Sequence, residues 1–150
     1  MVKTRNSIRI WSHIAKCFNV LSDEDIATSP AIHSFAAVPI IKHSFPEYAT
    51  KDILSAVFNH TLGCADMSLF DKIIFLSDFI EDGRKYESCK ATARFVKENI
   101  NKDNPYEQNV ILLNHALIMA IDFTVESVKS RNESIHSSTY KMKQSLEGKI

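Results

Sequence analysis

Apolar residues recur along most of this chain at the three- and four-residue spacing of an amphipathic helix. Between residues 105 and 129, for example, Val110, Leu113, Leu117 and Ile121 fall on one face of a predicted helix. The three glycines and four prolines are too few for the tight turns of an all-β domain, and Asp82-Gly83 follows a helical rather than an alternating pattern. The pattern therefore predicts an all-α fold of about seven helices.

Start and stop signals separate the predicted helices. Ser29-Pro30 is a start signal, because serine caps helices and proline fits the first turn. Ser68 and Asp71 resemble a capping box with aspartate in place of glutamate. Asn101 to Pro105 is the clearest break in the chain. The predicted helices cover about residues 7–18, 30–45, 50–60, 69–83, 87–100, 105–129 and 138–146.

Two segments are less regular. The polar stretch Ser22 to Asp25 fits either the cap of a short helix or a loop. Pro39 falls inside the helix predicted to follow Ser29-Pro30, where proline removes one hydrogen bond and typically costs about 3 kcal/mol or kinks the helix. Both segments lie in the first third of the chain, where the helical prediction is therefore weakest.

The composition is that of a folded, reduced, cytoplasmic protein. Its 150 residues are 45% hydrophobic, which predicts one domain over residues 1–150 with a polar tail at 147–150. Eighteen basic residues balance eighteen acidic ones, so no net field favours nucleic acid or an anionic membrane. Uninterrupted apolar runs are far shorter than the ~20 residues of a membrane span, and residues 1–9 lack the apolar segment of a secretory signal. Three cysteines without a CxxC spacing predict neither a disulfide framework nor a zinc knuckle. We expect no nucleic-acid partner and no membrane partner.

Three side chains on consecutive predicted helices are candidates for a metal site. His33 lies near the start of one helix, His60 at the end of the next, and Asp78 on the third, where it borders an apolar face. Two imidazoles and one carboxylate suit a borderline divalent metal. Spacing alone favours the plainer alternative, in which the histidines are cap or surface residues and Asp78 is simply exposed.

One continuous block, residues 60–81, carries a specific resemblance. It contains the His60 to Gly63 turn, the helix start at Met67 to Leu69, and Asp78 near the helix end, and Arg84 follows it. The block resembles the bacterial HD-domain symmetrical diadenosine tetraphosphate hydrolases, often called the YqeK type. Shorter matches extend the similarity to roughly residues 11–146: Ile14 to Lys16, Ile32-His33, Ile135-His136 and Thr139.

The resemblance implies an HD-type helical bundle and a metal-dependent phosphohydrolase. The family is described as holding two metal ions, usually iron, and as splitting diadenosine tetraphosphate into two ADP. Iron, with manganese as the alternative, is therefore the expected cofactor, and a dinucleoside polyphosphate or another nucleotide is the expected partner. The matched metal ligands are His33, His60 and Asp78. Asp78 and Lys16 match positions that act in catalysis. Positions that bind substrate are matched by Lys16, Thr61, Gly63, Arg84 and His136.

The chain departs from the family pattern near its beginning. Ser12-His13 stands where the family has a His-Asp dyad, and residues 1–11 contain no match for its first histidine. Imidazole binds through one nitrogen and cannot bridge two metals as aspartate does, so at most one metal ion is expected. His13 is either a replacement ligand or an ordinary polar side chain.

These departures imply that the family's first helix is missing, which would expose apolar residues and favour a homo-oligomer. They fit an impaired hydrolase or a non-catalytic relative that binds a nucleotide or a protein partner. They also fit either a natural short form or a truncated copy.

Overall fold

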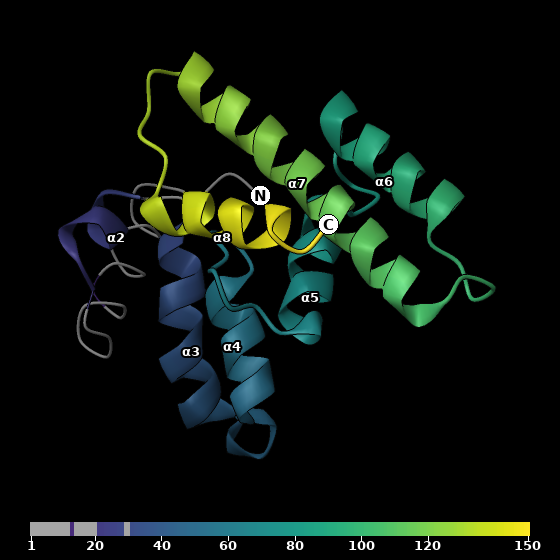
Figure 1. Ribbon diagram of the computed structural model, residues 1–150. Helices are drawn as coiled ribbons and strands as arrows, with labels where there is room; N and C mark the ends of the chain where they lie inside the picture. Colours follow the sequence, from purple (N-terminus) through teal and green to yellow (C-terminus); the bar gives the residue numbers. More distant parts are fainter. Residues whose placement is uncertain (1–12, 14–20, 29–30) are drawn as a thin grey trace.

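The computed structural model describes His13, residues 21–28 and residues 31–150, and these residues contain helices and no strands (Figure 1). The all-α fold expected from the sequence is confirmed. Its described elements are α2 (Asp23–Ala27), α3 (Ile32–Ser44), the 3₁₀ helix η2 (Pro46–Tyr48), α4 (Lys51–Asn59), α5 (Leu69–Phe79), α6 (Glu87–Asn99), α7 (Tyr106–Ser130) and α8 (Ser137–Glu147).

Local hydrogen bonds set several helix starts. The hydroxyl of Ser22 accepts the backbone N–H of Asp25, whose carboxylate accepts the N–H of Ser22 in return, so the polar stretch caps the short helix α2. Ser68 and Asp71 form the same reciprocal box before α5, as predicted. The hydroxyl of Thr50 caps α4, also as predicted.

The beginning of the chain is described only in part. The first predicted helix, over about residues 7–18, lies outside the described residues except for His13. The predicted start at Ser29-Pro30 lies outside them as well. α3 begins at Ile32 and continues through Pro39 to Ser44, so the proline does not end the helix.

α5 is shorter than the sequence pattern predicts. It ends at Phe79 rather than near Gly83, because Ile80 adopts φ −98° and ψ 11° and leaves the regular helix. The guanidinium of Arg84 then folds back, and its Nε donates to the backbone carbonyl of Asp78 at 3.2 Å. This bond satisfies one of the carbonyls that a helix end leaves without an internal partner.

The largest buried cluster joins α5, α7 and α8. Leu117 and Ile121 of α7 are fully buried and share this cluster with Leu76 of α5 and Met142 of α8. Full burial of a leucine or isoleucine side chain contributes about 1.5–3 kcal/mol, so this cluster accounts for much of the packing energy. α6 packs on α7, while α3 and α4 lie side by side and reach the cluster through α5 (Figure 1).

α7 is long and apolar enough to cross a membrane, judged by length and composition alone. A core helix meets the same criteria, and α7 packs against α5, α6 and α8. The sequence expectation considers only uninterrupted apolar runs, whereas the mean hydropathy over a longer stretch of α7 is higher than those runs indicate. We assign its apolar face to the core because it buries these residues: Leu113, Ala116, Leu117, Ala120 and Ile121.

Candidate functional site

Two histidines meet where the start of α3 lies beside the end of α4. His33 is the second residue of α3, and His60 is the C-cap of α4. Their Nε2 atoms lie 3.0 Å apart, and the ring planes meet at 72°. The packing of α3 on α4 therefore brings together two of the three predicted metal ligands.

Neighbouring groups orient this histidine pair. His60 Nδ1 lies 2.6 Å from the carbonyl oxygen of Val57. A carbonyl only accepts, so Nδ1 carries a proton and donates it to Val57, which leaves Nε2 as the nitrogen that faces His33. The hydroxyl of Thr61 lies 3.3 Å from His33 Nε2. An imidazole whose second nitrogen donates to a carbonyl is the usual arrangement of a metal-binding histidine.

Asp78 is held by a cation. Arg84 Nη2 donates to its Oδ2 at 2.8 Å, and the Asp78 side chain is 47% exposed. Among the residues that the structure describes, no three His, Cys, Asp or Glu side chains are arranged to hold a metal ion. The convergence of Asp78 with the histidine pair therefore stays a prediction. Asp78 is also more exposed than expected, because the sequence pattern of α5 places it at the border of an apolar face.

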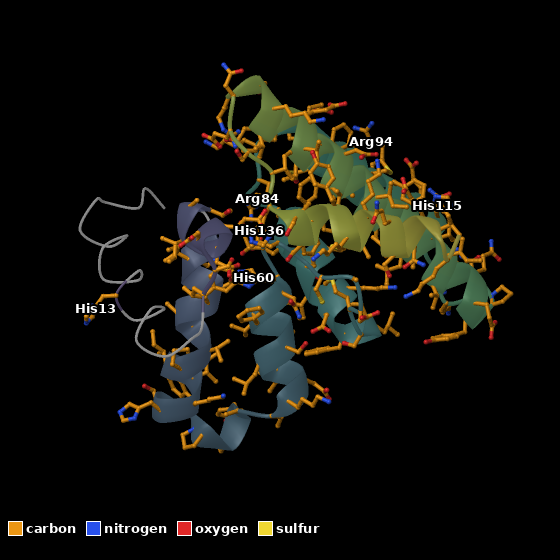
Figure 2. The ribbon with its side chains drawn as sticks, turned by 60° about the vertical axis from the view of Figure 1, so that its left-hand side comes forward. His13, His60, Arg84, Arg94, His115 and His136 are labelled. Carbon is orange, nitrogen blue, oxygen red and sulfur yellow. The ribbon has the colours of Figure 1, made fainter. Side chains whose placement is uncertain are left out.

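A cavity of about 250 Å³ begins at His60, one member of the histidine pair, and extends to the ends of α5 and α7. Its polar lining includes His60, Thr61, Asp78 and Arg84, together with Arg131 at the end of α7. Figure 2 labels His60 and Arg84, which both line this cavity. Part of the remaining wall is aromatic: Phe75, Phe79, Tyr86 and Phe123.

A second cavity, of about 310 Å³, lies between α5, α6 and α7. Its lining contains no histidine and no charged side chain. Phosphate chemistry requires such groups, so the cavity beside His60 is the candidate functional site.

The turn that carries His60 and Thr61 is fixed from α8. Gly63 adopts φ +68°, and a Cβ at this position would lie 2.1 Å from the sulfur of Met142. Thr139 of α8 donates its hydroxyl hydrogen to the carbonyl of Leu62 at 3.0 Å. The structure therefore gives Gly63 a role in the close approach of this turn to α8, and its predicted contact with substrate stays a prediction.

His136 joins α8 to α2 and is only 6% exposed. Its Nδ1 accepts the N–H of Ser138, so its Nε2 carries the proton and donates to Asp25 at 3.0 Å. Glu24 accepts both the backbone N–H and the hydroxyl of Ser137. Both ring nitrogens of His136 are thus engaged within the protein, and a substrate contact would require one of these bonds to be exchanged.

Acid is expected to weaken the contact between α2 and α8. Burial raises the pKa of Asp25, but hydrogen bonds from Ser22 and His136 outweigh it and leave the pKa below its ordinary value of 3.8. A depressed pKa in the folded state adds stability that is fully present above the unfolded value and is lost as the pH falls through the folded value. Asp25→Asn should therefore lower stability at neutral pH and make unfolding less sensitive to acid below about pH 4.

Urea unfolding measured from about pH 7 down to about pH 2 tests this expectation. Asp23→Asn is the matched control, because Asp23 is an exposed carboxylate in the same helical turn. It should retain the acid sensitivity of the original chain. If the stability of Asp25→Asn falls in acid as steeply as that of the original chain, the contribution of Asp25 to this pH dependence is refuted.

Two sequence candidates remain, His13 and Lys16. His13 is exposed and lies well apart from His60 (Figure 2). Lys16 lies outside the described residues. Conversely, no sequence pattern points to Arg131, because the relation of a cation at a helix end to a cavity depends on how α7 packs.

Comparison with known proteins agrees with the resemblance. No family model matches the chain. It is 30% identical over 89 residues to the symmetrical bis(5'-nucleosyl)-tetraphosphatase of Halalkalibacterium halodurans and 27% identical over 90 residues to that of Bacillus subtilis. These matches cover 59% and 60% of this chain but 41% of each relative, so the matched part spans about two fifths of the curated relatives.

The fold is similar to that of a solved structure from Clostridium acetobutylicum, described as a predicted HD superfamily hydrolase involved in NAD metabolism. The TM-score is 0.78 at 27% identity, covering 95% of this chain and 69% of that one. The fold is therefore of the HD-hydrolase type. Within that class, the resemblance to the symmetrical tetraphosphatases is confirmed.

Proposed function

We propose that this chain is a metal-dependent phosphohydrolase that cleaves a dinucleoside polyphosphate symmetrically, with diadenosine tetraphosphate as substrate and ADP as product. The observation that carries the proposal is the 3.0 Å approach of the His33 and His60 Nε2 atoms, at the edge of a cavity that His60 lines together with Asp78 and Arg84. The similarity to two symmetrical tetraphosphatases supports the choice of substrate.

The donor set fits one divalent ion. His33 and His60 would hold it through Nε2, since two nitrogens 3.0 Å apart suit ligands that each lie about 2.0–2.1 Å from the same ion. Asp78 would join them if its carboxylate exchanged Arg84 for the ion. Imidazole and carboxylate suit iron and manganese. When bound, such an ion supplies Lewis-acid polarisation of a phosphoryl oxygen.

The side chains around the histidine pair favour a phosphate substrate. Arg84 presents a planar guanidinium, whose paired N–H groups match phosphate oxygens. An incoming phosphate would release Asp78 from Arg84 by taking its place. The aromatic wall, which includes Phe79 and Phe123, limits water around the reacting phosphate and strengthens these charge interactions.

A second candidate function is nucleotide binding without turnover. The ion pair between Arg84 and Asp78 favours it, because a carboxylate that is held by a guanidinium does not hold a metal. In this alternative, the cavity would bind a nucleotide and the histidine pair would serve only to join α3 to α4.

Product analysis separates the two functions. The purified chain would be incubated with diadenosine tetraphosphate and Mn²⁺ or Fe²⁺, and the nucleotides separated by anion-exchange chromatography. The proposal predicts ADP as the only product and no turnover in EDTA. Equal amounts of ATP and AMP would contradict symmetrical cleavage, and binding without any product would favour the second candidate.

A further inference from the structure

A second guanidinium lines the candidate site from the far end of the longest helix. Arg131 is the C-cap of α7 and contributes to the same cavity as His60, Asp78 and Arg84. Asn132 follows with φ 56°, in the left-handed region, and ends the helix there. Arg131 therefore reaches the cavity from a different element than Arg84 does.

Hydrogen bonds hold the Arg131 side chain at the rim of the cavity. Its Nη1 donates to the hydroxyl of Ser127 at 2.8 Å, and its Nη2 donates to Glu133 at 3.1 Å. Ser127 itself lines the cavity. A guanidinium has five N–H donors, so these two bonds leave capacity for the oxygens of a ligand. The ion pair with Glu133 is about half exposed on both sides, and exposed pairs of this kind are weak and readily exchanged.

The charges of the cavity favour an anion at Arg131. Two arginines and one aspartate line it, so among these side chains positive charge exceeds negative by one. Asp78 and Arg84 are paired with each other within the lining, whereas the partner of Arg131, Glu133, is not a lining residue, so Arg131 is the cation that the cavity offers to a ligand. Phosphate oxygens are suitable partners because a guanidinium binds them in a bidentate manner.

The rest of the cavity favours a nucleotide over inorganic phosphate. Tyr86 is 73% exposed and lines the cavity together with Phe79 and Phe123. Aromatic faces of this kind stack on nucleobases. About 250 Å³ is smaller than a typical site for a whole drug-sized ligand, so the cavity would hold one end of a dinucleoside polyphosphate.

We propose that Arg131 is a phosphate-binding residue that contacts a phosphate beyond the one nearest Arg84, so that the site prefers nucleotides with longer phosphate chains. This inference rests on the proposed function of the same cavity. It adds a specificity-determining residue on α7 to the side chains contributed by α4 and α5.

Titration calorimetry with ADP and AMP in the presence of Mn²⁺ tests the inference without requiring turnover. Loss of a charge-assisted hydrogen bond predicts that Arg131→Gln binds ADP about tenfold more weakly and AMP within about twofold of the original chain. Arg131→Lys should recover part of the loss. Arg94→Gln is the matched control, because Arg94 is an exposed arginine of α6 that does not line the cavity (Figure 2).

The outcomes separate the inference from the proposed function. ADP affinity that is unchanged in Arg131→Gln, or AMP affinity that falls as much as ADP affinity, would overturn the inference even if diadenosine tetraphosphate were hydrolysed. ADP affinity that depends on Arg131 in a chain without turnover would support the inference and refute the hydrolase. A chain that binds neither nucleotide would overturn both.

Discussion

Replacing His60 with alanine is expected to reduce the hydrolysis of diadenosine tetraphosphate by about 100-fold or more, because direct ligands matter at least as much as the groups that orient them. His60 supplies one of the two nitrogens that face each other at 3.0 Å, and its orientation is set by the bond to the carbonyl of Val57. Steady-state rates measured at saturating Mn²⁺ give the size of the loss. Metal affinity should fall in parallel.

His115→Ala is the control for this substitution, since His115 is exposed on α7 and lies away from His60 (Figure 2). It should retain full turnover. Circular dichroism should show that His60→Ala keeps its helical content, and His60→Gln provides a variant with a polar side chain at the same position. Full turnover in both His60 variants would mean that the histidine pair joins helices and does no chemistry.

Gly63→Ala is expected to destabilise the protein by about 2–4 kcal/mol, through backbone strain together with overpacking of the core. Gly63 has a positive φ of 68°, and the added methyl group would lie 2.1 Å from the sulfur of Met142. Met142 is 1% exposed and belongs to the central cluster, so its side chain has little room to move. Urea unfolding followed by circular dichroism measures the change.

Gly148→Ala is the matched control for the glycine substitution. Gly148 has φ −74°, and the nearest atom to an added Cβ is 3.7 Å away. Alanine in a compatible conformation stabilises a protein by about 0.4–1 kcal/mol, so this variant should be at least as stable as the original chain. Equal stability of Gly63→Ala and Gly148→Ala would contradict the prediction, because the turn after His60 would then accommodate a Cβ without strain.

Helix starts were predictable from the sequence wherever their causes are local. The capping box of Ser68 and Asp71 was predicted because its hydrogen bonds span only three residues. Ser22 and Asp25 form the same box, although the sequence left that stretch open between a cap and a loop. The end of α5 was not predictable in the same way. There the carbonyl of Asp78 accepts a bond from Arg84, a partner six residues away that comes close only after the chain turns back.

The candidate site was predictable only in part. The resemblance identified His33 and His60, and the packing of α3 on α4 brings their nitrogens together. It also gave Arg84 a role at substrate phosphates, whereas the structure shows this side chain bound to Asp78. Arg131 was missed because its relation to the cavity depends on where a helix of 25 residues ends in space.

Metal content is the most direct test of the histidine pair as the centre of the site. The chain would be purified with added Mn²⁺ or Fe²⁺, freed of unbound metal and subjected to elemental analysis. We expect about one ion per chain, because the histidine pair provides ligands for a single ion, and we expect loss of that ion in His60→Ala. No bound ion, a stoichiometry of two, or retention of the ion in His60→Ala would contradict it.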